Sequence, residues 1–338
     1  MSKFGKIAAV AVMTAGILVM FAVLVVAGKI LSDGRQAAQR VKNEPTVDLF
    51  EEPVPLRIDG YDGDCMEPCI SADGTYLFFN NSNAANVESH ILFAKRTGEN
   101  TFKYLGSLPG TRSTSKDMAP TLDRRGNFYF TSLRTFSRDG RSLFAGKFQA
   151  GDATGVQTER ATGVQTECVT GVHPVPGEVW PGKPGWIDMD CGISPDGTTL
   201  VIAQSQFFPG SDAPVKSDLV ISHLRGGRFF IDADSPRILK NVNTEALEYA
   251  PSISANGLEL YFTRGDLLLV NGSAPTPAMR VMIATRRSIN EPFSQPSTIA
   301  SIRGFVEAPT LPANGQEIFF HKKEPTRFAI YRAVRRVR

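Results

Sequence analysis

Acidic residues recur just before the first strand of a repeated sequence unit, and they are the first candidates for chemistry. Carboxylates that gather at a narrow channel repel one another, attract a cation or a basic group, and acquire raised pKa values. The residues in this position are Asp64, Glu67, Asp117, Asp188, Asp190, Glu248 and Glu307.

Three interpretations of these carboxylates stay open. They can accept hydrogen bonds from backbone N–H groups at the strand starts and so stabilise the repeat. They can offer oxygen ligands to Ca²⁺ or Mg²⁺ in the channel. They can also supply the acid and base of a glycoside hydrolase. For this last chemistry the catalytic candidates are Asp117, Asp188 and Glu248, which share one register, three residues before the repeat's proline position.

The two tryptophans lie in one loop, EVWPGKPGWIDMD at 178–190, which leads directly into an inner strand. An exposed tryptophan near the channel can stack on a sugar or anchor a partner. Packing of both rings over a sheet edge is the alternative. The predicted ligand-binding residues are therefore Glu67, Asp117, Trp180, Trp186, Asp188, Asp190, Glu248 and Glu307.

Other kinds of site find little support in the sequence. Four cysteines and four histidines are spread over the repeated units, and no Cys-x-x-Cys, phosphate-binding loop, dinucleotide fingerprint or His-Glu-x-x-His occurs. A net charge of +3 argues against nucleic-acid binding. We expect no cofactor apart from Ca²⁺ as an option in the channel. The cysteines are expected as buried free thiols, although a disulfide is chemically allowed in an exported domain.

Strands must position these residues. Five segments share a short apolar strand, a turn that ends in glycine, and a second apolar strand, which is a hairpin signal. They are EPCISADGTYLFFN at 67–80, APTLDRRGNFYFTS at 119–132, DCGISPDGTTLVIA at 190–203, APSISANGLELYFT at 250–263 and APTLPANGQEIFFH at 308–321. A third and a weaker fourth strand signal follow, which is typical of propeller blades. We predict an all-β fold, a five-bladed β-propeller of four-stranded blades. A lone strand at 54–58 is expected to complete the fifth blade.

The N-terminal segment differs from the rest. Residues 7–28 read IAAVAVMTAGILVMFAVLVVAG, which has no charge and is long enough to cross ~30 Å of hydrocarbon. The segment predicts one N-terminal transmembrane helix, so that 1–28 is a membrane anchor or a signal sequence cleaved near Gly28. Residues 29–47 are expected as a polar linker and 48–338 as the propeller domain. These expectations place the propeller outside the cytoplasm in the cell envelope, periplasmic or extracellular, or make it secreted if cleavage occurs.

The repeated units resemble the TolB-type, WD-like β-propeller repeats of bacterial envelope proteins. The likeness rests on the order of acidic residue, proline and Ser-x-Asp-Gly hairpin, and on the linkers NVNTEALEYAPSISANGLELYFT at 241–263 and NEPFSQPSTIASI at 290–302. It implies the fold over about 54–338, while such propellers serve as docking scaffolds, carbohydrate-active enzymes and peptidase accessory domains alike.

We predict a binding scaffold for an envelope protein, peptide or glycan, without catalysis. The alternative is a carbohydrate-active enzyme that uses the channel carboxylates.

Overall fold

The computed structural model describes residues 34–84, 87–151, 167–180, 182–208, 213–268 and 276–337. The chain divides into two compact units. The smaller unit comprises 1–44 and 266–278, and its described part contains a helix at 34–43 and an ion pair of 2.6 Å between Arg40 and Asp266. The larger unit comprises 45–265 and 279–338 and contains the repeated hairpins.

Strands dominate the described residues. They form one sheet of ten strands, one of five and two of four. In chain order the strands are β1 (Thr46–Val47), β2 (Val54–Pro55), β3 (Arg57–Asp59), β4 (Met66–Ile70), β5 (Tyr76–Asn80), β6 (Ile91–Arg96), β7 (Thr101–Ser107), β8 (Asp117–Leu122), β9 (Asn127–Ser132), β10 (Leu143–Gln149), β11 (Cys168–Pro174), β12 (Gly177–Glu178), β13 (Trp186–Ile193), β14 (Thr199–Gln206), β15 (Lys216–Arg225), β16 (Arg228–Ile231), β17 (Leu247–Ile253), β18 (Glu259–Leu268), β19 (Thr276–Thr285), β20 (Ser297–Ile299), β21 (Val306–Thr310), β22 (Glu317–Lys323) and β23 (Phe328–Val334). Two short helices, α2 (Phe136–Asp139) and α3 (Ser235–Ile238), lie in the connections.

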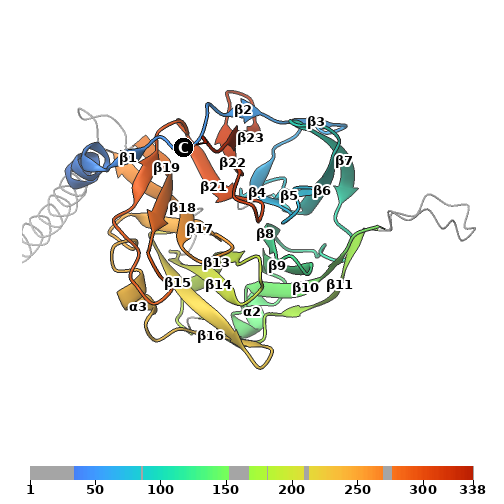
Figure 1. Cartoon of the computed structure of the whole chain (residues 1–338). Coiled ribbons are helices and arrows are strands. Elements are labelled where there is room, and N and C mark those ends of the chain that lie inside the picture. Colours follow the sequence, from blue (N-terminus) through green and yellow to red (C-terminus); the bar gives the residue numbers. More distant parts are fainter. Residues whose placement is uncertain are drawn as a thin grey trace, which may run out of the picture. The chain divides into compact units, whose positions relative to one another are not determined.

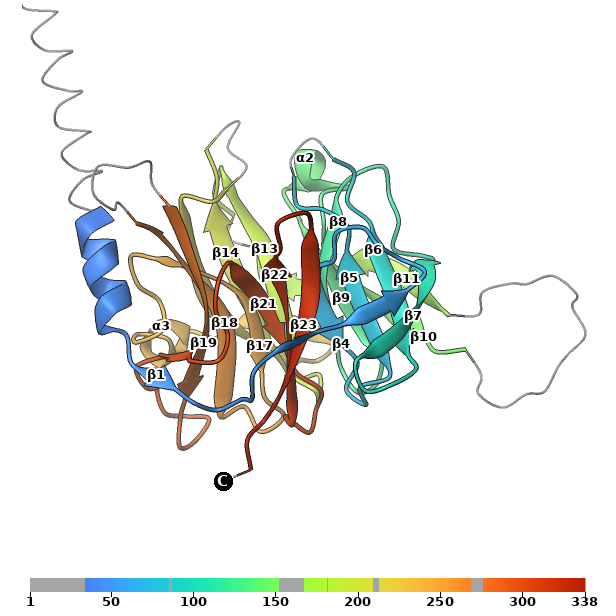
Figure 2. The same cartoon turned by 90° about the horizontal axis from the view of Figure 1, so that it is seen from above.

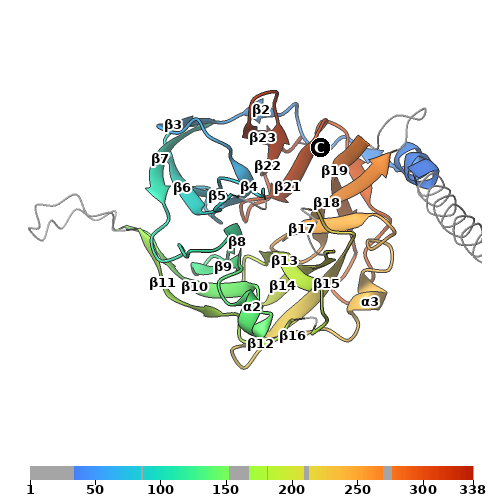
Figure 3. The ribbon, with the colours of Figure 1, turned by 180° about the vertical axis from the view of Figure 1, so that it is seen from behind.

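The inner strands of the hairpin units follow one another around a common centre (Figures 1 and 3). β4 contacts β8, β8 contacts β13, β13 contacts β17, β17 contacts β21, and β21 contacts β4 again. Figure 2 shows this last junction, where β21, β22 and β23 lie beside β4. The ten-stranded sheet contains two hairpin units. A single parallel pair between β15 and β17, Ser217 opposite Leu247, joins them. The larger unit is therefore an all-β, propeller-like ring.

The turn of each hairpin follows from its Ser-x-Asp-Gly or related sequence. In the first unit, Gly74 has φ +75° and its N–H donates to Ser71 O at 2.8 Å. Ser71 Oγ donates to Asp73 Oδ1 at 2.5 Å and accepts the N–H of Tyr76 at 2.8 Å. The glycine allows the positive φ, and the two side chains satisfy backbone groups that the turn leaves free.

Apolar side chains on both faces of the strands hold neighbouring sheets together. Every residue of β5 is buried. Phe78 packs with Phe128 of the next sheet, and Phe79 packs in a cluster with Phe319 of the last sheet. A strand buried on both faces reads as a continuous apolar run, which explains the sequence YLFFN at 76–80.

Ring closure uses the N-terminal part of the larger unit. β2 pairs antiparallel with β23, with Val54 opposite Arg332, so the expected outer strand of the last sheet is confirmed for Val54–Pro55. The rest of the predicted strand at 54–58 pairs elsewhere, because β3 runs parallel to β7 in the first sheet. Residues from both ends of this unit therefore hold its first and last sheets together, which protects the sheet edges.

The predicted single-pass anchor is not found in the part of the chain that the structure describes. Among the helices of the described residues, none is long and apolar enough to cross a membrane. The segment 7–28, on which the prediction rested, lies outside the described residues. We therefore draw no location from it.

Candidate functional site

Every inner strand is irregular at the same position of the repeat. The pairing register shifts between Met66 and Cys69, Met118 and Thr121, Asp188 and Asp190, Tyr249 and Ser252, and Glu307 and Thr310. Each shift is a β-bulge, which bends a strand and re-aims the side chain beside it. The repeat therefore places one re-aimed residue of each inner strand near the centre.

Four of these bulges hold a residue other than glycine in the left-handed conformation. The φ angle is 49° at Glu67 and at Ala119, 48° at Ala250 and 54° at Ala308, and each residue directly precedes a proline. Residues before proline are normally extended. A left-handed non-glycine residue costs about 1–3 kcal/mol and is found preferentially at functional sites.

Side chains of the preceding sheet hold these strained residues in place. In each case the backbone N–H of the strained residue donates to a polar side chain. The N–H of Ala119 donates to Asn80 Oδ1 (3.3 Å) and that of Ala308 to Thr263 Oγ1 (2.9 Å). The N–H of Ala250 donates to Asp190 Oδ2 (3.1 Å) and that of Glu67 to His321 Nδ1 (2.9 Å). These hydrogen bonds also connect neighbouring hairpin units.

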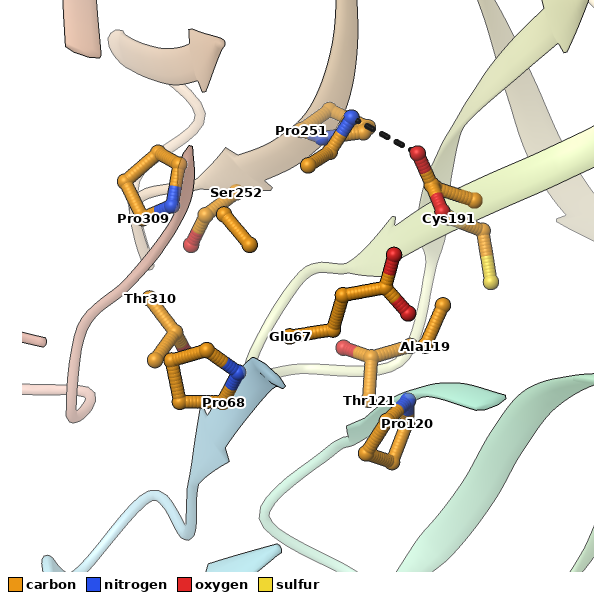
Figure 4. Close-up of a pocket in the computed structure, with 13 residues that line it drawn as sticks. Glu67, Pro68, Ala119, Pro120, Thr121, Cys191, Pro251, Ser252, Pro309 and Thr310 are labelled. Atoms are coloured by element: carbon orange, nitrogen blue, oxygen red, sulfur yellow. Dashed lines mark hydrogen bonds between the residues drawn. The ribbon is translucent and has the colours of Figure 1, made fainter. Parts of the chain in front are cut away.

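The bulges surround a small cavity, around which Pro68, Pro120, Pro251 and Pro309 lie (Figure 4). Its volume is about 40 Å³. One water molecule occupies ~30 Å³ in the liquid, so the cavity has room for ordered water rather than for a sugar ring. Two acidic residues, Glu67 and Asp190, contribute to its wall.

Glu67, Asp190 and Glu307, which we call the central carboxylates, come from β4, β13 and β21. The charge of Glu307 is among the causes that raise the pKa values of Glu67 and Asp190. Within the described part of the chain, no lysine or arginine forms an ion pair with any of the three. Their hydrogen-bond partners among the described residues are neutral donors and one histidine, so their mutual repulsion has no cationic compensation there.

Glu67 has one satisfied oxygen and one free oxygen. Asn83 Nδ2 donates to Glu67 Oε1 at 2.9 Å. Glu67 Oε2 is buried and has no hydrogen-bond partner among the described residues. A buried oxygen of this kind is costly when charged, and it can instead hold a proton for transfer.

Two neighbours hold the carboxylate of Glu307. Tyr249 OH donates to Oε1, and His321 Nε2 lies 2.9 Å from Oε2. A backbone N–H can only donate a hydrogen bond. His321 Nδ1 accepts one from the N–H of Glu67, so this nitrogen carries no proton. The proton of the ring is therefore on Nε2 and points to Glu307. The side chain of His321 is 1% exposed and that of Glu307 13% exposed.

Burial raises the pKa values of three of these groups. It raises the pKa of Glu67 well above its usual range, and the charges of Asp190 and Glu307 add to the effect. Burial and then the charge of Glu307 raise the pKa of Asp190 to about 7, against the lowering effect of the Ala250 N–H. Burial and the Glu307 charge also raise the pKa of Tyr249, which keeps its hydroxyl protonated. A carboxyl group whose pKa is raised by burial can act as a general acid near neutral pH.

The predicted catalytic candidates do not line this cavity. They are Asp117, Asp188 and Glu248, which we call the loop carboxylates, and all three are buried. Asp117 accepts hydrogen bonds from Ser113 N at 2.7 Å, from Ser132 Oγ at 2.6 Å and from Arg134 Nη2 at 2.7 Å.

Glu248 repeats this arrangement. It accepts from Thr244 N at 3.0 Å and from Arg264 Nε at 2.8 Å. Asp188 accepts from Gln204 Nε2 at 3.1 Å. Burial raises the pKa values of Asp188 and Glu248 to about 7, although their donors act in the opposite direction. These contacts stabilise the loops before the inner strands, as the structural interpretation of the sequence pattern expects.

The other predicted residues are spread over the ring. Asp64 Oδ1 accepts the N–H of Phe328 at 2.8 Å, a link between the first and last sheets. Trp180 is 43% exposed and lies against Gly140, which ends α2. Trp186 is half-buried at the start of β13, with Lys183 Nζ 5.7 Å from its ring centre. The cavity wall includes neither tryptophan.

Metal binding and thiol chemistry receive no support from the described residues. Within the described ranges, no group of three or more His, Cys, Asp or Glu side chains is arranged to hold a metal ion. Cys65, Cys69 and Cys191 are buried free thiols, and Cys168 is a partly buried one. Burial raises the pKa of Cys191, which lines the cavity, well above its ordinary value.

Sequence reasoning missed Tyr249 and His321, although a signal for both was present. The position of Tyr249 holds Met66, Met118 and Met189 in other units, and that of His321 holds Asn80, Ser132, Ala203 and Thr263. The loop carboxylates follow the repeat, whereas the central carboxylates depart from it, because Glu67 and Asp190 stand where three units have alanine. Departures from a repeat mark residues that the repeat itself does not need.

No family model and no curated protein matches this chain. Solved structures do match it. One is the catalytic domain of a GH62 alpha-L-arabinofuranosidase from Coprinopsis cinerea, with 10% identity over 86% of this chain and 98% of that chain and a TM-score of 0.49. A second is Zg3597, a family 117 glycoside hydrolase from Zobellia galactanivorans, with 11% identity over 85% and 90% and a TM-score of 0.49. A third is MPT-1, a GDP-Man-dependent mannosyltransferase from Leishmania mexicana, with 11% identity over 90% and 95% and a TM-score of 0.43.

These matches do not bear out the predicted scaffold without catalysis. With TM-scores below 0.5, they carry no argument for the activity of the named proteins in this chain either. At such low identity the likeness concerns the fold alone, so any activity of this chain has to be argued from its own side chains. The resemblance to TolB-type repeats stays a prediction.

Proposed function

We propose that this chain is a carbohydrate-active enzyme of the glycoside hydrolase kind and that Glu67, Asp190 and Glu307 carry its chemistry. One observation carries the proposal. Three carboxylates from three sheets interact at the centre of the ring without a cationic partner among the described residues, and the pKa values of two of them, Glu67 and Asp190, are raised. Cleavage of a glycosidic bond needs a pair of carboxyl groups, one protonated and one charged.

Glu67 is the general acid in this proposal. Its raised pKa favours the protonated form, and its Oε2, which has no hydrogen-bond partner among the described residues, can direct the proton to the oxygen of the leaving group. Glu307 is the charged partner, because Tyr249 and His321 donate to its two oxygens. Asp190 lies with Glu67 in the cavity wall, and its charge contributes to the raised pKa of the acid.

The size of the cavity defines where substrate would bind. Its 40 Å³ suit a water molecule between the carboxyl groups rather than a sugar ring. The sugar would contact the partly exposed side chains of Glu67 and Glu307 from outside the cavity. The proposal therefore concerns the end of a glycan chain or a side branch that reaches the centre of the ring.

We also propose that the ring has five blades. The support is one inner strand per hairpin unit, closed in the order β4, β8, β13, β17 and β21. In the last blade β2 provides the fourth strand beside β21, β22 and β23.

Turnover of two sets of glycosides tests the proposed roles. The full chain is assayed on a panel of 4-nitrophenyl glycosides, which have a good leaving group, and on the matching methyl glycosides, which need protonation. We expect Glu307→Gln to lose about 10²–10⁴-fold in kcat on both sets and Glu67→Gln to lose it mainly on the methyl glycosides. Glu245→Gln, the same change at an exposed residue, is the control. Equal activity of all four proteins, or none in the wild type on any glycoside, would overturn the proposal.

A further inference from the structure

His321 contacts both residues of the proposed catalytic pair, Glu67 through its backbone and Glu307 through its carboxylate. Its Nδ1 receives the backbone N–H of Glu67 at 2.9 Å, and its Nε2 lies 2.9 Å from Glu307 Oε2. The ring is 1% exposed and packs edge-on against Phe328, with ring centres 5.5 Å apart. Elements from the two ends of the larger unit therefore meet on one imidazole, since β4 carries Glu67 while β21 and β22 carry Glu307 and His321.

Other units show which part of this arrangement is structural. Asn80 and Thr263 stand at the equivalent position and accept the N–H of Ala119 and of Ala308. Accepting that N–H is thus a task of the repeat, and a small side chain performs it. A histidine adds a second nitrogen, and this nitrogen reaches a carboxylate that lies within the same last sheet.

We propose that His321 is a positioning residue that holds the backbone of Glu67 with one nitrogen and orients the carboxylate of Glu307 with the other. The inference rests on the proposed function for its catalytic meaning, whereas the geometry stands without it. One rigid ring sets the relation between the two groups, because a change in the direction of the imidazole moves both hydrogen bonds together. Pre-organisation of this kind raises the rate of the chemical step more than it raises substrate affinity.

Three substitutions separate the two tasks. His321→Asn keeps an acceptor near the place of Nδ1, as Asn80 does in its unit, and loses the donor to Glu307. His321→Gln places an amide donor near the place of Nε2. His321→Ala removes both. We expect His321→Asn to melt close to the wild type and to lower kcat about 10- to 100-fold with little change in KM, the effect of one hydrogen bond to a charged group. His321→Gln should recover part of that loss.

A spectroscopic measurement tests the geometry without a substrate. The chain has four histidines, so ¹⁵N-histidine labelling gives few ring signals, and the His321→Asn spectrum identifies those of His321. At pH 7 we expect Nε2 protonated and Nδ1 unprotonated in the wild type. A protonated Nδ1, or a His321→Asn variant with unchanged kcat, overturns the positioning role. If the tautomer is as expected and the wild type turns over no glycoside, the proposed function fails while the geometry is upheld.

Discussion

Two sets of carboxylates lie at the starts of the same inner strands and behave differently. The loop carboxylate Asp117 accepts from a backbone N–H, a serine hydroxyl and Arg134. The central carboxylate Glu67 accepts from one amide, and its second oxygen is unpartnered among the described residues. Residue type and strand position are nearly the same in the two cases. The difference lies in their hydrogen-bond partners. Asp117 is held by several donors, whereas Glu67 keeps an oxygen without a partner among the described residues, which can hold a proton for transfer.

The repeat explains the difference. Asp117, Asp188 and Glu248 occupy one register and accept hydrogen bonds from residues of their own hairpin units and of the loops that precede them. Glu67 shares its position with Asp190 alone among acidic residues, and no other unit has an acidic residue at the position of Glu307. A single histidine links Glu67 and Glu307 across the junction of the first and last sheets. Carboxylates that follow the repeat therefore indicate structure here, and those that depart from it indicate a site.

The largest expected effect on stability comes from removing a loop carboxylate. Glu248→Ala removes the carboxylate that forms an ion pair with Arg264, whose side chain is 1% exposed, together with both hydrogen bonds to Thr244. Loss of one member of a buried ion pair typically costs about 3–5 kcal/mol. Urea unfolding of the variant measures the change, with Glu245→Ala as an exposed control expected to stay within about 0.5 kcal/mol. A change in Glu248→Ala as small as in the control would show that the loop carboxylates do not stabilise the ring.

The pH dependence of stability gives the next largest effect. Asp190 has a pKa of about 7 in the folded chain, against an ordinary value of 3.8. A raised carboxyl pKa stabilises the fold below pH 4, and this contribution is lost as the pH rises from 4 to 7. For Asp190 alone the loss is on the order of 4 kcal/mol, with one pKa unit worth about 1.4 kcal/mol.

Asp190→Asn tests this contribution, because an asparagine oxygen can still accept the N–H of Ala250 and carries no charge. We expect the variant to be more stable than the wild type at pH 8 and to show a flatter profile between pH 4 and 7. The free energy of unfolding at several pH values measures both. Asp188→Asn is the comparison at a loop carboxylate with a pKa also near 7, so a flattened profile in that variant alone would place the effect outside the centre.

The smallest expected change in stability is at the proposed acid. Glu67→Gln removes a carboxyl group that no cation pairs with among the described residues, and it leaves an amide oxygen for Asn83. We expect a melting temperature equal to or slightly above that of the wild type, together with the loss of turnover described above. A fall of several degrees would instead assign Glu67 to the stabilising set.

Much of the fold was predictable from the sequence because it is local. A hairpin turn depends on a serine, an aspartate and a glycine within four residues, as in Ser71, Asp73 and Gly74, and those residues stand together in the sequence. The contact of Val54 with Arg332 is distant, yet it was predictable because a repeat that ends one strand short needs another strand to close. The division of 54–58 between two sheets was not predictable, since it depends on the path of the chain around the ring.

The site could be predicted only in part. The acidic positions were visible in the sequence, and the central carboxylates were among the predicted ligand-binding residues. The separation of the carboxylates into two sets was not predictable. Asp188 and Asp190 are only two positions apart, and they have different partners only after the bulge between them has formed.

By itself the sequence determined the all-β class, the hairpin repeat and the carboxylates at the strand starts, because each depends on neighbouring residues. Tertiary structure alone decided which carboxylates meet. Glu67 and His321 lie at opposite ends of the larger unit, and a 2.9 Å hydrogen bond joins them only when the ring closes. Tertiary structure also decided the raised pKa values of Glu67 and Asp190, because the pKa of a carboxyl group depends on the burial and the charges that the closed ring provides.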